Sequence, residues 1–231
     1  MEWEKIGCFL LSNFLWLLMK SGIMNNIKGV TGEKAMAIDI DNLLADTLLE
    51  LCREKEYKNV TIKDIRERSG ISRTGFYNHF KDKNDLAQWI YYERIQTTFQ
   101  KENMDTLNNY YEALVSYYQR IQKYHFFLKS ALKDNGQNCL RDYMFEHPYE
   151  WELQYHLQWY EENTGEEPEM EELRFFTEYH SSGAVSMTIK WIQRDMPISP
   201  EEMARRITYL KRVGLAKILN DTEENDHHPY E

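Results

Sequence analysis

Two short amphipathic segments on either side of Gly70 constrain the fold of this chain more than any other feature. The first begins at Thr61, a helix-capping residue, and carries Asp64 three residues later in a variant of the capping box. The second begins at Ser72, another capping residue, and ends near Phe80. Because glycine readily adopts the backbone conformation of a sharp turn, the two segments predict a helix-turn-helix.

Apolar residues repeat at helical spacing on both sides of this motif. An i, i+4, i+8, i+11 series predicts a preceding helix from about Asp39 to Glu54, formed by Ile40, Leu44, Leu48, Leu51 and Cys52. A following helix is predicted from near Asp85 to about Lys101. The 231 residues include only ten glycines and five prolines, which favours helices over a loop-rich β architecture.

Basic residues gather in the motif although the whole chain is acidic. Residues 58–83 contain seven lysines and arginines and three acidic residues, a local charge of +4 in a chain of formal charge −10. A partner responds to the local field, so the acidic total does not exclude a polyanion.

The outer side of the second segment matches the requirements of duplex DNA. Arg73 is placed to reach guanine O6 and N7, Thr74 can contact either a base edge or a thymine methyl group, and Gly75 leaves room for the backbone. Phosphate oxygens are expected to be contacted by Thr61, Lys63, Tyr77, His79, Lys81 and Lys83. A catalytic role for His79 lacks a nucleophile at a suitable spacing.

The stretch VTIKDIRERSGISRTGFYNHFKDKNDL, residues 60–86, resembles the DNA-binding domain of the TetR/AcrR family of transcriptional regulators, with G-I-S, F-Y-x-H-F and K-x-K in register. WIQRDMPISPEEMA, residues 191–204, is similar to the closing helices of that family. The family often has Ile-Ala and Ala-Gly where this chain has Ile65-Arg66 and Ser69-Gly70. The resemblance implies an all-helical homodimer and a DNA interface formed by Thr61, Lys63, Ser72, Arg73, Thr74, Gly75, Tyr77, His79 and Lys83.

Beyond Asp105 the pattern stays helical and becomes rich in tyrosine and tryptophan. The rings either pack the core or line a pocket for a small-molecule effector, and the family implies such a pocket. A cationic or planar effector would suit rings edged by carboxylates. The candidate ligand-binding residues are Tyr110, Tyr117, Tyr118, Tyr124, Phe127, Tyr143, Trp151, Tyr155 and Trp159.

Two helices are predicted near the C-terminus, joined by a turn in which Ser199 caps the second helix and Pro200 takes its first position. Apolar and small residues on their stripes are predicted to form the dimer face: Phe176, His180, Gly183, Met187, Trp191, Met203, Ile207, Leu210 and Gly214. After Asn220 the sequence is too polar to pack, which predicts a disordered tail over residues 221–231.

The N-terminal residues 1–35 are predicted to be an extension outside the main fold. Residues 6–19 are strongly apolar but too few to span a bilayer comfortably, and no positive region precedes them. A translation start at Met24 or Met36, an additional packing helix, and a signal or anchor are the alternatives. Three widely spaced cysteines, Cys8, Cys52 and Cys139, favour a reducing cytoplasm.

We therefore expect an all-α chain with a DNA-binding domain at residues 36–84 and a helical regulatory and dimerisation domain at residues 85–220. The expected function is a dimeric transcriptional regulator, more commonly a repressor, that binds a palindromic operator and responds to a small effector. An alternative is a co-regulator whose acidic segment 146–172, with ten acids and no Lys or Arg, binds a partner protein. No catalytic set, cofactor motif or compact metal pattern is found, since His147 and His156 do not match zinc spacing.

Overall fold

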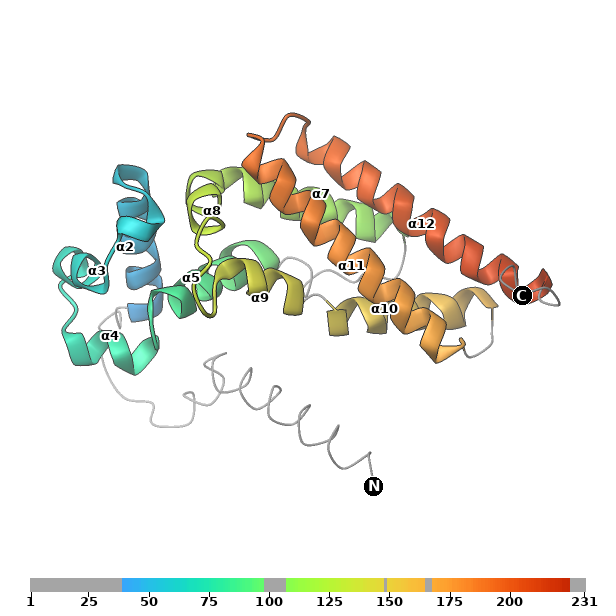
Figure 1. Cartoon of the computed structure of the whole chain (residues 1–231), viewed down its shortest axis with the longest axis horizontal. Coiled ribbons are helices and arrows are strands. Elements are labelled where there is room, and N and C mark those ends of the chain that lie inside the picture. Colours follow the sequence, from blue (N-terminus) through green and yellow to red (C-terminus); the bar gives the residue numbers. More distant parts are fainter. Residues whose placement is uncertain (1–38, 98–106, 148, 165–167, 225–231) are drawn as a thin grey trace, which may run out of the picture. The chain divides into compact units, whose positions relative to one another are not determined.

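Helices are the only regular elements in this computed structural model within residues 39–97, 107–147, 149–164 and 168–224, which are the residues that the structure describes (Figure 1). The N-terminal part contains α2 (Ile40–Glu54), the single-turn η2 (Tyr57–Asn59), α3 (Ile62–Ser69) and α4 (Arg73–His79). The chain continues as α5 (Lys83–Tyr91), η3 (Tyr92–Gln96), α7 (Leu107–Lys123), α8 (His125–Ala131), α9 (Leu140–Glu146), α10 (Tyr149–Thr164), α11 (Met170–Gln193) and α12 (Pro200–Glu224). The all-α prediction is confirmed.

In the N-terminal part, α3 and α4 begin at side-chain caps where the sequence predicts them. The Thr61 hydroxyl accepts a 3.1 Å hydrogen bond from the Asp64 N–H, and the Asp64 carboxylate accepts one of 2.7 Å from the Thr61 N–H. Gly70 ends α3 with a φ of 74°. The Ser72 hydroxyl accepts from the Gly75 N–H at 3.0 Å and begins α4. These short helices are fixed in length by their own ends.

The helix predicted to begin near Asp85 starts two residues earlier, at Lys83, and changes from an α-helix to a π-helix after Tyr91. Asp82 caps α5 by accepting from the Asp85 N–H at 2.8 Å. The residues that follow, η3, form this π-helix. Such wider turns often occur at functional regions of a helix. The predicted end near Lys101 lies outside the described residues.

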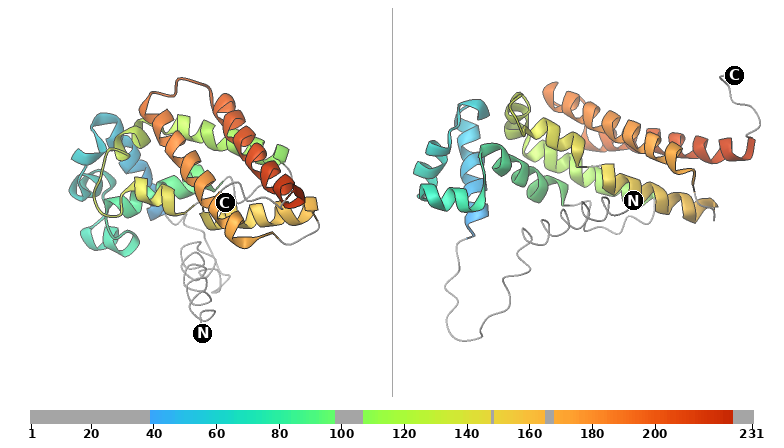
Figure 2. Two further views of the ribbon diagram at one scale, coloured as in Figure 1. Left: turned by 45° about the vertical axis from the view of Figure 1, so that its right-hand side comes forward. Right: turned by 60° about the horizontal axis from the view of Figure 1, so that its bottom comes forward.

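The C-terminal part is a set of packed helices in which α7 packs on α12 and α10 packs on α11. Figure 2 shows α11 and α12 running beside each other from their connecting turn. As predicted, the Ser199 hydroxyl caps α12 by accepting from the Glu202 N–H at 3.2 Å. The helix then continues to Glu224, past the predicted boundary after Asn220, because polar residues can extend a helix without packing. The remaining tail, like the predicted extension 1–35, lies outside the described residues.

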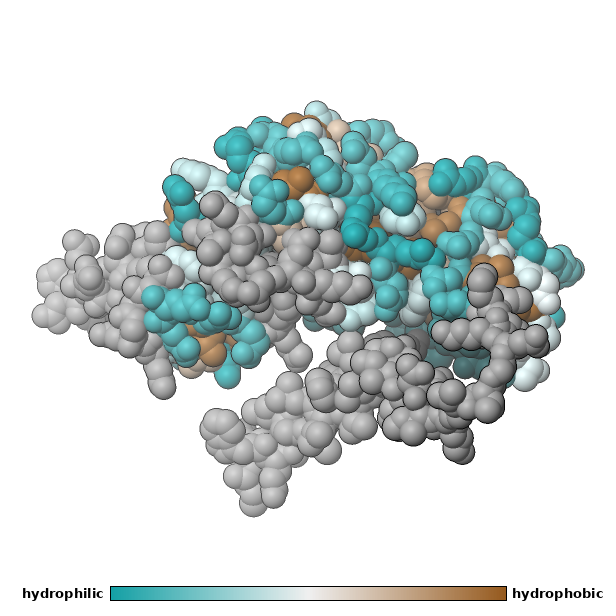
Figure 3. Space-filling view, turned by 180° about the vertical axis from the view of Figure 1, so that it is seen from behind, coloured by the Kyte–Doolittle hydropathy of each residue, from teal (hydrophilic) through white to brown (hydrophobic). Residues whose placement is uncertain are grey.

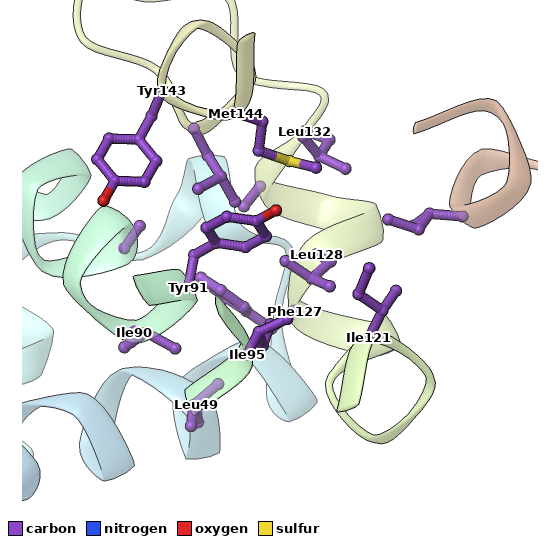
Figure 4. Close-up of a cluster of buried hydrophobic side chains, with 14 of the residues drawn as sticks. Leu49, Ile90, Tyr91, Ile95, Ile121, Phe127, Leu128, Leu132, Tyr143 and Met144 are labelled. Atoms are coloured by element: carbon purple, nitrogen blue, oxygen red, sulfur yellow. The ribbon is translucent and has the colours of Figure 1, made fainter. Parts of the chain in front are cut away.

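A single hydrophobic core joins the N-terminal helices to the C-terminal helices of the described residues. The core contains Leu49 of α2, Tyr91 of α5, Phe127 of α8 and Met144 of α9, and all four side chains are buried (Figure 4). Interiors of this kind are close-packed, so a shift in one helix is felt by its neighbours. The predicted domain boundary after residue 84 falls inside one compact unit that begins at Asp39, and the division of functions at that residue stays a prediction.

One face of the described residues is mainly polar (Figure 3), and the Cys52 thiol is buried in the core. The face shown in Figure 3 is mainly hydrophilic where it is coloured, and hydrophobic residues form small separate patches. Among the described helices, none combines the length and the apolar character needed to cross a membrane. Cys52 is a buried core residue, as predicted, and burial raises the pKa of its thiol to about 12.

Candidate nucleic-acid interface

Helix α4 has one apolar side and one polar side. Phe76 is fully buried beneath it, and Phe80 follows its last turn into the same core. Arg73, Thr74 and Tyr77 are exposed on the other side, and the Arg73 guanidinium lies 5.5 Å from the centroid of the Tyr77 ring. The helix therefore presents cationic and hydrogen-bonding groups to solvent from its first turns, which is the arrangement expected of a recognition helix.

Gly75 is required by the protein's own turn. A Cβ atom at this position would lie 2.8 Å from Cγ2 of Ile71 and 3.2 Å from Oγ of Ser72. Contacts this short force a neighbour to move, so only glycine fits without rearrangement. The sequence predicts that Gly75 allows close approach of DNA, and the short distance to Ile71 is a second, internal reason for a glycine at this position.

The start of α3 offers fewer free groups than predicted. The Thr61 hydroxyl is already engaged with Asp64, accepting from its N–H and donating to its carboxylate at 2.7 Å. Asp64 also pairs with Lys55 at 2.8 Å. Lys63 is exposed and lies 3.7 Å from Glu67, a loose ion pair that a phosphate can displace. Lys63 therefore remains the more available of the two predicted phosphate contacts on α3.

His79 connects α4 to α2. Its Nδ1 donates to a carboxylate oxygen of Asp41 at 2.7 Å, which joins the last turn of α4 to the first turn of α2. Asp41 was not identified from the sequence, because nothing in its local pattern distinguishes it from a solvated acidic residue. The pair leaves only the far nitrogen of the imidazole for the predicted phosphate contact.

Lys83 differs from the prediction. Its ammonium donates hydrogen bonds to the carbonyls of Tyr57 at 2.7 Å and Val60 at 2.8 Å. It also lies 4.1 Å from the centroid of the Tyr57 ring. Because the charge is satisfied inside the protein, the structure assigns Lys83 to holding the start of α5 against the segment before α3. The exposed Lys81 is the neighbouring cation that remains available to a phosphate.

The predicted ligand-binding rings are mostly core. Five are buried and three are half-buried, whereas the side chain of Trp151 lies outside the described set. The buried rings are Tyr110, Tyr117, Tyr118, Phe127 and Tyr143, and the half-buried ones are Tyr124, Tyr155 and Trp159. Several phenols bond to one another or to threonine, as between Tyr91 and Tyr117 at 2.6 Å. The burial of these rings agrees with packing, the first of the two alternatives, and their part in ligand binding stays a prediction.

Neither of two surface hollows among the described residues is lined by the predicted ligand-binding residues. One, of about 210 Å³, lies between Tyr111 of α7 and the Arg205 to Arg212 part of α12. The other, of about 350 Å³, lies between the end of α2 and α8, and Phe126 and Ser130 are among its lining residues. The second hollow therefore lies where an N-terminal helix meets a C-terminal helix.

The predicted dimer face must be corrected. His180, Trp191, Met203 and Ile207 are buried within the protomer, and Phe176 is half-buried. Its ring packs so closely on Gly214 that an added Cβ would lie 2.4 Å away. A stripe of four- and three-residue spacing describes either side of a helix, and these residues form the inner side. Gly183, Met187 and Leu210 are the predicted members that are exposed.

The outer stripes of the same helices carry large exposed hydrophobic residues. On α11 these are Phe175, Tyr179 and Met187, and on α12 they are Tyr209, Leu210 and Val213. Phe175 and Tyr179 keep 70% and 75% of their surface in contact with solvent, which is more than isolated apolar residues normally show. This face, which we call the α11/α12 face, was missed because burial on one side of a helix cannot be read from spacing alone.

Comparison with known proteins agrees with this architecture. Residues 44–89 match the family model described as bacterial regulatory proteins, tetR family, and residues 108–212 match the model described as transcriptional regulator C-terminal region. No curated protein matches the chain significantly in sequence.

Two solved structures are similar in fold. The dihydroxyacetone kinase operon activator DhaS aligns with a TM-score of 0.58 at 18% identity, over 79% of this chain and 98% of its own. A TetR-family transcriptional regulator from Syntrophomonas wolfei aligns with a TM-score of 0.53 at 17% identity, over 76% of this chain and 94% of its own.

Proposed function

The chain belongs to the TetR family of bacterial transcriptional regulators, and from that premise we propose that it binds a near-palindromic operator as a homodimer, with α4 of each protomer in a major groove. The observation that carries the proposal is the exposed outer side of α4, where Arg73, Thr74 and Tyr77 stand over a fully buried apolar side. A twofold dimer would place two such helices on two half-sites related by the same symmetry.

Each exposed group then has a stated task. Arg73 donates two hydrogen bonds to guanine, and Thr74 contacts the neighbouring base edge. Lys63 and Lys81 contact phosphate oxygens on either side, which positions the helix without reading sequence. The His79–Asp41 bond and the Lys83 bonds hold α4 and α5 in place, so they support the interface from within.

The α11/α12 face is the proposed dimer interface. It carries six large hydrophobic side chains that are at least 48% exposed in the protomer. Gly183 lies on the same side of α11 with no atom near its missing Cβ, which permits a second helix to approach closely. Burying such a patch against its own copy is the usual route to a symmetric dimer.

Regulation is proposed to act through the shared core. A small effector that binds the regulatory helices in only one of two arrangements would shift the population of DNA-binding dimers. Hydrogen bonds connect α8 directly to η2 and α5. The Tyr57 N–H donates to Oγ of Ser130 on α8 at 2.7 Å, and the Tyr57 carbonyl accepts a hydrogen bond from the Lys83 ammonium. Movement of α8 would therefore reach the segment that positions α3 and α4.

Repression is the proposed sign of regulation, as it is the commoner outcome in the family. One structural relative of the same fold is an operon activator, so the sign is decided by measurement of transcription with and without the protein.

A second candidate function is a co-regulator that binds a partner protein. It is favoured by the exposed acidic residues at the end of α10 and the start of α11: Glu161, Glu162, Glu169, Glu171 and Glu172. Capture of one stoichiometric partner that is lost when these residues are changed to glutamine would support this candidate over a small effector.

The operator proposal is tested by fluorescence anisotropy with duplexes that tile the DNA upstream of the gene, at two salt concentrations. We expect tight, salt-dependent binding to one near-palindromic duplex and much weaker binding to random DNA. Equal weak binding to every duplex would reject an operator upstream of the protein's own gene. The target would then be sought at distant sites or in a partner protein.

A further inference from the structure

Four ionisable side chains meet in the interior of the C-terminal helices, and none of them lines either of the two surface hollows described above. Glu152 and His156 come from α10, His180 from α11 and Lys211 from α12. All four are at most 9% exposed, and Lys211 and His156 are completely buried. Charged side chains are almost never buried in this way unless they are paired, so the cluster requires an explanation.

The Lys211 ammonium makes no hydrogen bond to an atom of the described residues. It lies 4.0 Å from the centroid of the Tyr110 ring and 5.0 Å from that of Tyr155. The nearest carboxylate oxygen, on Glu152, is 3.6 Å away, beyond a normal hydrogen bond. Two tyrosine faces beside a carboxylate form the kind of cage that recognises an organic cation, and here the chain's own lysine occupies it.

Two acceptor atoms in the cluster lack a donor among the described protein groups. One is Oε2 of Glu152, which lies 3.6 Å from Nδ1 of His180. The other is Nε2 of His156. The Thr177 hydroxyl donates to the Leu173 carbonyl at 2.7 Å and therefore accepts from Nδ1 of His156 at 2.8 Å, which leaves Nε2 as a bare acceptor.

The electrostatics of the cluster agree with this assignment. Burial, aided by the Lys211 charge, lowers the pKa of His156 far below its ordinary value, so the imidazole is neutral. Burial also lowers the pKa of Lys211 to about 8, even though Glu152 opposes the change. The internal cation is therefore poorly stabilised in a cage whose acceptors remain unsatisfied.

We propose that the Glu152, His156, Tyr110 and Tyr155 cluster is the effector site, and that it binds a small organic cation with N–H donors, such as an amine or amidine, in place of the Lys211 ammonium. The ligand's N–H groups would satisfy Glu152 and His156, which Lys211 does not reach. No group of three or more His, Cys, Asp or Glu side chains among the described residues is arranged to hold a metal ion. This inference rests on the proposed function, because it names the class of effector.

Occupation of the cage would be linked to movement of α12. Lys211 lies one residue from Leu210, which is on the α11/α12 face, and three residues from Gly214, on which the Phe176 ring packs. Displacing the Lys211 side chain therefore requires α12 to shift or turn against α11. A ligand that enters the cage thus alters the proposed dimer interface, and with it the separation of the two recognition helices.

The test is a thermal-shift and calorimetric titration of the full chain with butylamine and benzamidine, against tetramethylammonium, glycerol and acetate as probes of other chemistry. We expect the two N–H cations to raise the Tm by roughly 3–6 °C at ten times their Kd, and the other three to have little effect. Absence of any shift with the amines, or equal shifts with tetramethylammonium or glycerol, would overturn the proposal.

Variants sharpen this test. Lys211→Ala removes the internal cation and is expected to bind butylamine about tenfold more tightly than the wild type, whereas Lys190→Ala, the same change at an exposed site on α11, is a control that should leave the affinity unchanged. Glu152→Gln is expected to abolish amine binding. If that variant does not fold, the double variant Glu152→Gln/Lys211→Met replaces it, because it removes both charges of the ion pair. The proposal would be contradicted if this double variant bound the amine as tightly as Lys211→Ala does.

The titration contains no DNA, so its outcome is separate from the operator proposal. Operator affinity is measured on the same samples by anisotropy. Amine binding without any operator binding would reject the proposed function and retain the cation site. Operator binding without amine binding would do the reverse.

Discussion

The ammonium of Lys83 lies over the ring of Tyr57, 4.1 Å from its centroid, and donates a 2.7 Å hydrogen bond to the carbonyl of the same residue. The Tyr57 hydroxyl in turn donates to the side chain of Asn84 at 2.6 Å. These contacts close the first residues of α5 onto η2, with α3 and α4 held between them in the chain. The cation that the sequence assigns to DNA therefore stabilises the frame of the DNA-binding part.

Lys83→Met is expected to lower the free energy of unfolding by about 1.5–3 kcal/mol, because two carbonyls lose a charged hydrogen-bond donor. The salt dependence of operator binding should stay as in the wild type. Urea unfolding and anisotropy at several salt concentrations measure the two effects. Lys81→Met is the matched variant, and it should keep wild-type stability while reducing the salt slope by about one. A stable Lys83→Met protein with a reduced slope would restore the phosphate role.

Arg73→Ala is expected to weaken operator binding by about 1–3 kcal/mol and to relax the preference at one base pair, because the bidentate contact with guanine is lost. Anisotropy with the operator and its single-base variants measures both effects. Arg212→Ala, an exposed arginine on α12, serves as the control for loss of one positive charge. An equal loss of affinity for random duplex would show that Arg73 contacts phosphate instead.

Gly75→Ala is expected to destabilise the protein by about 1–3 kcal/mol, because the new Cβ would lie 2.8 Å from Cγ2 of Ile71. Thermal unfolding without DNA measures this effect. Gly136→Ala is the matched control, since its Cβ would meet only Asp134, at 3.4 Å. Normal stability of Gly75→Ala combined with lost operator binding would mean that DNA, and not the turn, requires the glycine.

The local features of the fold could be predicted because they depend on near neighbours in the chain. The capping box of Thr61 and Asp64, the left-handed Gly70 and the Ser72 cap each follow from residue types within a few positions. The inner and outer stripes of α11 could not be distinguished in the same way. Phe175 and Phe176 are adjacent and equally hydrophobic, and only packing against α10 and α12 decides which one is exposed.

The candidate site residues also differ in whether nearby sequence or distant contacts determine their role. Arg73 and Thr74 are identified from their place in the motif, whereas Lys83 and Lys211 are lysines whose partners lie far away in sequence. The Lys211 ammonium is near Glu152 and Tyr110, and nothing in the sequence around it signals burial. Long-range pairing of a charged residue is therefore the part of this protein that required a structure.

Asp64→Asn is expected to lower stability at neutral pH and to have a smaller effect in acid. Hydrogen bonds from Lys55, the Thr61 hydroxyl and the Thr61 N–H lower the pKa of Asp64 below its ordinary value. A carboxyl with a lowered folded pKa contributes stability above its unfolded pKa, about 3.9, and loses it as the pH falls toward the folded value. Urea unfolding between pH 3 and 7 should therefore show the two proteins converging in acid.

Glu67→Gln is the control for the change in net charge, because Glu67 forms only an exposed ion pair with Lys63, at 3.7 Å. A constant difference between Asp64→Asn and the wild type at every pH would mean that the Asp64 contribution is packing or capping geometry, and not its charge.

Tyr179→Glu and Leu210→Glu test the α11/α12 face. Both side chains are exposed in the protomer, Tyr179 at 75% and Leu210 at 59%, so glutamate should be tolerated by the monomer fold. In a twofold dimer each change buries two carboxylates without partners, at a cost of about 3–5 kcal/mol for an uncompensated charge. The dimer Kd should rise roughly a hundredfold or more, as measured by sedimentation equilibrium.

Phe145→Glu on α9 changes an aromatic residue that is 37% exposed and is not among the six residues of this face, so it should leave the dimer unchanged. Operator binding separates the consequences further, because a monomer that keeps α4 intact should still bind a half-site weakly while losing the cooperative contact with the second one. If Tyr179→Glu and Leu210→Glu remain dimers with full operator affinity, the exposed aromatic residues serve another partner, and the acidic start of α11 beside them becomes the first place to look for it.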